Sequence, residues 1–111
     1  MGRKGARLTG DATETAAMLV DALGALGNVT SKKMFGGYGV FLDGVMFALV
    51  DSGGVPHLRT DESTTRQFEK AGSDKHSRMP YWSIPAAVVD DSGKLVEWGT
   101  EALEVARAAK K

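Results

Sequence analysis

A glycine-rich apolar segment, MFGGYGVFLDGVMFALV, constrains the fold more than any other part of the chain. It runs from Met34 to Val50. From residue 38 onward the side chains alternate with a period of two, which predicts a strand. One face of this strand carries Tyr38, Val40 and Leu42, and the other carries Gly39 and Phe41.

The dipeptide Asp43-Gly44 divides the segment into two strands. A type I′ hairpin turn needs positive φ at both central residues, and Asp-Gly is one of the pairs that adopt it most readily. The following residues, Val45–Val50, are apolar on both faces, as in a central strand. After a second turn, DSGG, we expect a third strand over Val55–Thr60, with Pro56 at its start or at a sheet edge. The segment therefore predicts a three-stranded antiparallel meander.

Three amphipathic helices are predicted around this meander. Asp11 begins a capping box for a helix over about Thr13–Leu26. Asp61 caps a second helix over Glu62–Ala71, which ends before a glycine. A third helix begins at residues 90–92 and carries an apolar stripe of Leu95, Trp98, Ala102, Val105 and Ala106.

A fourth strand is predicted over Met79–Ile84, so the element order is α-β-β-β-α-β-α. Hairpin-linked strands imply an antiparallel sheet, and the helices can cover one of its faces, which gives the α+β class. We expect a flexible basic tail over residues 1–10 and one domain over residues 11–111. If Phe41 and Phe47 lie on the uncovered face, the sheet presents aromatics there, as a partner surface or a self-association surface does.

Composition narrows the classes of function. Of 111 residues, 14 are Lys or Arg and 14 are Asp or Glu, so no net field attracts nucleic acid. Direct DNA binding would depend on a few cations: Arg3, Lys4, Arg7, Lys32 and Lys33. The chain has no cysteine, which removes disulfides and thiolate chemistry, and its longest apolar runs are too short for a membrane span. We expect a cytoplasmic protein that does not enter membranes.

No motif in the sequence predicts a catalytic, cofactor or metal site. The Gly37-Tyr-Gly39 pair lacks the third glycine and the following helix that a dinucleotide fingerprint needs. The only two histidines, His57 and His76, stand nineteen positions apart and form no HxxxH or HxH pair. No GxSxG nucleophile elbow occurs. An alternative hypothesis is a small-ligand or enzymatic pocket formed near Tyr38, His57, Tyr81 and Trp82.

Several segments in combination resemble the TfoX (Sxy) N-terminal-domain family. They are MFGGYGVFLDGVMFALV, Leu58-Arg-Thr-Asp61, Phe68-Glu-Lys-Ala-Gly72, Pro80-Tyr-Trp82, Ile84-Pro85 and Leu95-Val-Glu-Trp98. The resemblance covers about residues 29–109. The residues of this chain that match the family motif are interpreted as fold-forming. They are Met34, Phe35, Gly36, Gly37, Gly39, Gly44, Met46, Phe47, Ala48, Leu49 and Tyr81.

The resemblance implies a small α+β domain with a role in regulating natural competence in bacteria. Full-length relatives act as coactivators with the cyclic-AMP receptor protein at promoters, without a known enzymatic reaction. They carry a second, helical domain after this one, and many have a longer segment where this chain has Gly72–Met79. We therefore expect a stand-alone N-terminal domain that acts without catalysis or cofactors, through contacts with the transcription machinery, the cyclic-AMP receptor protein or a second copy of itself.

Overall fold

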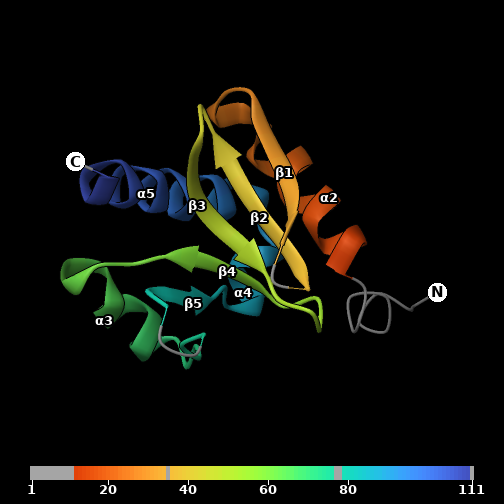
Figure 1. The fold of residues 1–111 in the computed structure, drawn as a ribbon. Coiled ribbons are helices and arrows are strands. Elements are labelled where there is room, and N and C mark those ends of the chain that lie inside the picture. Colours follow the sequence, from red (N-terminus) through yellow and green to blue (C-terminus); the bar gives the residue numbers. More distant parts are fainter. Residues whose placement is uncertain (1–11, 35, 77–78, 111) are drawn as a thin grey trace.

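The computed structural model describes residues 12–34, 36–76 and 79–110. Five strands form one antiparallel sheet in which each strand pairs with its neighbour in the chain (Figure 1). Their bounds are β1 Val29–Met34, β2 Gly37–Leu42, β3 Val45–Val50, β4 Pro56–Arg59 and β5 Tyr81–Ser83. The predicted α+β class and antiparallel meander are confirmed. The predicted tail over residues 1–10, the cap at Asp11 and the motif residue Phe35 lie outside the described residues.

Strand β1 has no counterpart among the predicted strands. Its sequence, VTSKKM, is polar, and the four residues Thr30–Lys33 are exposed. It pairs with β2 along its whole length, from Val29 opposite Leu42 to Met34 opposite Gly37. An edge strand with water on both faces carries no alternating apolar pattern, so periodicity did not reveal it.

The helices are α2 Ala12–Ala22, η1 Leu23–Leu26, α3 Glu62–Lys70, α4 Ala86–Val89 and α5 Ser92–Lys110. The first predicted helix is confirmed, with its last turn tightened into the 3-10 helix η1. The Asp61 cap of α3 is also confirmed: its carboxylate accepts hydrogen bonds from the amides of Ser63 and Thr64. The short helix α4, which follows Pro85, was not predicted. None of the helices in the described ranges is long and apolar enough to cross a membrane.

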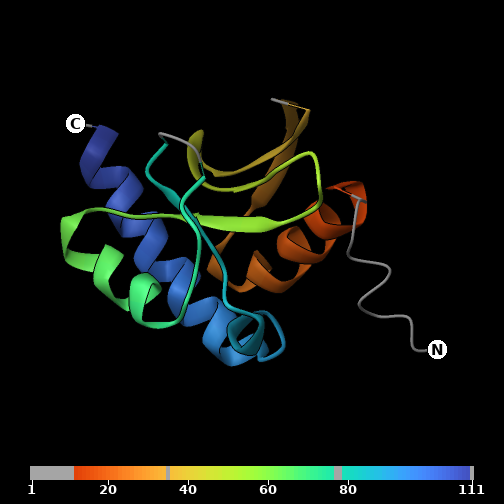
Figure 2. The same cartoon turned by 90° about the horizontal axis from the view of Figure 1, so that it is seen from below.

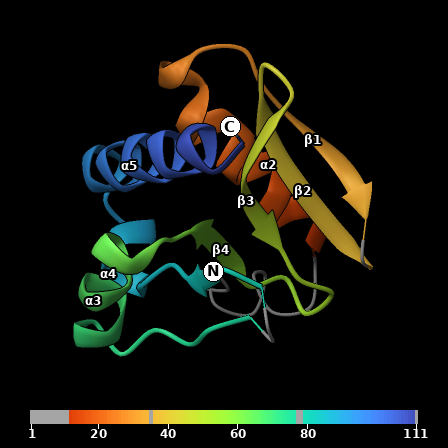
Figure 3. The same cartoon turned by 60° about the vertical axis from the view of Figure 1, so that its left-hand side comes forward.

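One core lies between the sheet and the helices. Helices α2 and α5 pack against the same face of the sheet, α2 on β1 and β2 and α5 on β3 and β4 (Figures 2 and 3). Helix α3 adds Phe68, whose ring meets Trp98 of α5 edge-on at 4.9 Å between centroids. The side chains buried in this core include Leu19, Leu23, Val40, Leu42, Phe47, Ala48, Leu58, Phe68, Leu95 and Leu103. The helices therefore cover one face of the sheet, as predicted.

The β2–β3 hairpin follows the predicted turn chemistry and also contains a β-bulge. Asp43 and Gly44 both have positive φ, 53° and 80°, as a type I′ turn requires. The bulge lies on β3: Val40 pairs with Ala48 and Phe41 with Met46, which leaves Phe47 as the extra residue. The bulge turns both Phe47 and Ala48 toward the core.

Candidate functional site

The face of the sheet that turns away from the helices, here called the open face, holds the candidate site. Val40, Ala48 and Leu58 stand opposite one another in the sheet and all belong to the core. Because successive strand residues point to opposite faces, the neighbouring row points the other way. This row runs across all five strands through Lys32, Gly39, Leu49, His57 and Ser83.

Gly39 is the point around which open-face side chains gather. A Cβ built on Gly39 would lie 2.9 Å from Met34 Sδ, 3.0 Å from Met46 Sδ and 3.0 Å from Phe41 Cε1. The missing side chain is therefore what lets these three residues close over the middle of β2. Each of the three is half-buried, so the cluster is an apolar surface that keeps contact with water. The glycine therefore shapes a surface.

Strands β3 and β4 separate beside this cluster. They pair only through residues 48–50 of β3, so the first half of β3 diverges from the end of β4. The phenol of Tyr81 crosses the gap and donates a hydrogen bond to the carbonyl oxygen of Met46 at 3.2 Å. A hollow of about 280 Å³ lies here, lined by Phe41, Gly44, Val45, Met46, Arg59, Tyr81, Ala106 and Ala109. The divergence of the two strands thus opens a mostly apolar hollow.

Arg59 brings positive charge into this hollow. Its guanidinium carbon lies 5.8 Å from the centre of the Tyr81 ring, within the range of a cation–π contact. Its Nε is buried and has no hydrogen-bond partner among the described residues. Burial raises the pKa of the Tyr81 phenol, an effect that the neighbouring Arg59 opposes. Tyr81 is therefore a neutral hydrogen-bond donor at pH 7, and Arg59 retains an unused donor beside apolar walls.

The two aromatics proposed for the interface separate in the structure. Phe41 is half-buried on the open face and lines the hollow, as the alternation of β2 predicts. Phe47 is 0% exposed and belongs to the core, so its placement on the uncovered face is wrong. The bulge in β3 is the reason. One extra residue interrupts the alternation of side chains along the strand, so Phe47 faces the core.

The four residues of the alternative pocket do not line one site. Tyr38 and Trp82 pack against the core on the helix side, where the Tyr38 hydroxyl lies 3.0 Å from the Thr13 hydroxyl. His57 and Tyr81 belong to the open face. The sheet separates the two pairs.

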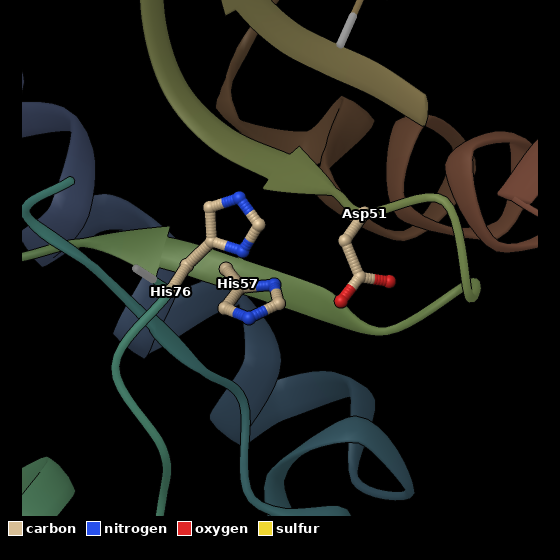
Figure 4. A group of neighbouring side chains, drawn as sticks. All are labelled: Asp51, His57 and His76. Atoms are coloured by element: carbon tan, nitrogen blue, oxygen red, sulfur yellow. The ribbon is translucent and has the colours of Figure 1, made fainter. Parts of the chain in front are cut away.

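A second group of polar side chains lies at the other end of the open face (Figure 4). It joins Asp51 after β3, His57 in β4 and His76 between α3 and β5, with one potential ligand atom of each within 4.8 Å of the others. The two imidazole rings meet edge-on at 4.9 Å between centroids. The isolated positions of His57 and His76 in the sequence do not predict this convergence, and the sequence predicts Asp51 only as part of a turn.

The surroundings of His57 favour its neutral form. Its side chain is 4% exposed, and burial lowers its pKa despite the opposing effects of the Val55 carbonyl and the Asp51 carboxylate. Nδ1 lies 2.9 Å from the carbonyl oxygen of Val55. A carbonyl oxygen only accepts, so Nδ1 carries the proton and Nε2 carries the lone pair.

The sequence matches the family model described as the TfoX N-terminal domain over residues 21–106. This range includes every strand of the sheet and most of α5. It also includes the open-face cluster, the three residues of the Asp51 group and every residue that lines the hollow beside Tyr81 except Ala109. Among curated proteins, none matches the chain.

Proposed function

The chain belongs to the TfoX N-terminal domain family, and we propose that it is a non-enzymatic regulatory domain acting through protein contacts in transcriptional regulation of the competence type. A cytoplasmic location is part of this proposal, since the transcription machinery works there. The partner class proposed is a protein of that machinery, with the cyclic-AMP receptor protein and RNA polymerase as the first candidates. The family supports this choice of partner, and the open face supports the mode of contact.

The hollow between β3 and β4 is the observation that carries the proposal. Interface centres are enriched in Tyr, Met, Phe and Arg, and the binding energy concentrates in a few such residues. Phe41, Met46 and Tyr81 supply apolar walls, and Arg59 supplies a cation whose Nε lacks a partner among the described residues. A carboxylate of the partner can accept from this guanidinium while an adjacent apolar side chain enters the hollow. The expected occupant is therefore an acidic and apolar segment of a protein.

Binding of the purified chain to the purified candidates tests the proposal. We expect wild type to bind, and Arg59→Gln to weaken binding by about tenfold or more, the loss typical of a central interface residue. Phe41→Ser should weaken it similarly, because it removes an apolar wall. Arg66→Gln is the matched control, since Arg66 is an exposed cation on α3, away from the hollow.

Two results would count against this function. If wild type binds neither candidate, the proposed partner class is wrong. If it binds and both variants bind equally well, contact occurs elsewhere on the chain. The mass of the chain in solution, measured over a range of concentrations, shows whether a second copy competes for the same face.

A further inference from the structure

The group formed by Asp51, His57 and His76 brings three separate segments of the chain together (Figure 4). Asp51 follows β3, His57 lies within β4, and His76 precedes β5. Ligand atoms of all three lie within 4.8 Å of one another. The group lies outside the hollow proposed for protein contact, because none of its members lines that hollow.

Two of the three side chains are already oriented. The His57 Nδ1–H donates to the Val55 carbonyl at 2.9 Å, which leaves Nε2 as the ring nitrogen with a lone pair for a metal ion. Metal-bound histidines are typically held by this kind of hydrogen bond on the second ring nitrogen. The Asp51 Oδ1 accepts from the amides of Gly53 and Val55, each at 2.9 Å. Because both bonds use Oδ1, the second oxygen, Oδ2, is the one available to a cation.

The donor set selects a class of ion. Two imidazole nitrogens and one carboxylate oxygen suit Zn²⁺ and related divalent transition ions, whereas Ca²⁺ and Mg²⁺ prefer oxygen donors alone. Tetrahedral Zn²⁺ with bonds of about 2.0–2.1 Å places its ligand atoms roughly 3.3 Å apart. Ligand atoms 4.8 Å apart are about 1.5 Å farther apart than this, so the group has to close when an ion binds. His76 is half-buried and lies outside any regular strand or helix, so side-chain rotation and a small shift of its segment can supply this closure.

We propose that Asp51, His57 and His76 form a binding site for a divalent transition ion of the Zn²⁺ class, with one coordination position left open. The ion would join the β3–β4 turn, β4 and the segment before β5 across the open face. It would act as a link between these segments, and no reaction is assigned to it. This site is independent of the proposed regulatory function and would exist whether or not the hollow binds a protein.

Titration of the metal-free chain with Zn²⁺, followed by calorimetry and by the melting temperature, tests the site. We expect one Zn²⁺ per chain and a melting temperature that rises with Zn²⁺ concentration, because an ion that binds only the folded state stabilises it. The chain contains only two histidines, so side-chain imidazole resonances report on the site without overlap. Both should shift together during the titration.

Three variants separate coordination from general charge. His76→Ala removes a half-buried ligand, and Asp51→Asn removes a carboxylate while keeping an oxygen for the Gly53 and Val55 amides. Each should weaken Zn²⁺ binding by more than tenfold, since even partners outside the coordination sphere contribute 10- to 100-fold. Asp74→Asn is the control, because this exposed carboxylate acts on His57 only through its charge.

The melting temperature of each metal-free variant establishes that it is folded before Zn²⁺ is added. The proposal is overturned if wild type shows no saturable Zn²⁺ binding. It is also overturned if both imidazoles keep their resonances, or if His76→Ala and Asp51→Asn bind Zn²⁺ as tightly as Asp74→Asn.

Discussion

Two glycines of β2 provide a paired test of how the sheet is packed. A Cβ at Gly37 would lie 1.9 Å from the Val50 carbonyl oxygen and 2.8 Å from the carbonyl carbon of Asp51. Both atoms are backbone, and Val50 takes part in the β2–β3 pairing. Reaching ordinary contact at about 3.5 Å requires a backbone displacement of roughly 1.5 Å. At Gly39 the same Cβ would instead meet side-chain atoms: Met34 Sδ at 2.9 Å, Met46 Sδ at 3.0 Å and Phe41 Cε1 at 3.0 Å.

The two substitutions should therefore differ in free energy of unfolding although they lie two residues apart. We expect Gly37→Ala to cost about 3 kcal/mol or more, at the upper end of overpacking costs, because backbone has to move. For a domain of this size the loss corresponds to a fall in melting temperature of about 12 °C. Gly39→Ala should stay within about 1 kcal/mol of wild type, since the methionine ends can rotate aside and alanine is favoured over glycine in a strand.

Urea unfolding followed by tryptophan fluorescence measures both values. Trp98 is a suitable probe because it packs against Phe68 in the core. The reasoning is refuted if Gly37→Ala unfolds within 0.5 kcal/mol of wild type (about the usual effect of a surface substitution), or if Gly39→Ala is the more damaging of the two.

Four further substitutions probe the core, the open face, a helix cap and the gap between strands. Phe47→Ala should cost about 3–5 kcal/mol by urea unfolding, because it empties a fully buried position, and Phe41→Ala should cost clearly less. Asp61→Ala should cost about 1 kcal/mol through loss of the α3 cap. Hydrogen bonds from Ser63 and Thr64 lower the pKa of Asp61 below its usual 3.8 in the folded chain. The ionised carboxylate therefore stabilises the fold fully at pH values above 3.8. This contribution is lost as the pH falls through the lowered pKa, and the difference between Asp61→Ala and wild type should shrink there. Tyr81→Phe should cost about 1 kcal/mol by leaving the Met46 carbonyl without its donor. Ultraviolet titration should show that the pKa of the Tyr81 phenol is raised above its usual 10.0.

Local chemistry made several elements predictable from the sequence. Asp43-Gly44 adopts the positive φ angles that the turn type demands, and Asp61 caps α3 through its own neighbours. Each depends on contacts within a few residues, which a sequence displays directly. The amphipathic stripe of α5 was predictable for the same reason, because one helix face meets one core.

The remaining features depend on how distant segments meet. The apolar residues of β3 predict a central strand, but its bulge decides that Phe47 faces the core, and no local pattern marks that bulge. The exposed strand β1 lacks alternation because neither of its faces is buried along most of its length. Arg59 enters the hollow only because β3 and β4 separate, and His57 meets His76 only through the path of the chain after α3. Sequence spacing contains none of this tertiary information.

The methionine methyl groups offer the most direct test of the central claim that the open face contacts a protein. Met46 lines the hollow and Met34 stands over Gly39 on the open face, whereas Met18 packs against the core on the helix side. The chain is labelled with ¹³C at its methionine methyls, and a partner that binds it is added. The methyl signal of Met46 should shift or broaden most and that of Met34 next, while the Met18 signal stays unchanged. A partner that perturbs Met18 and leaves Met46 and Met34 unaffected would contradict the account.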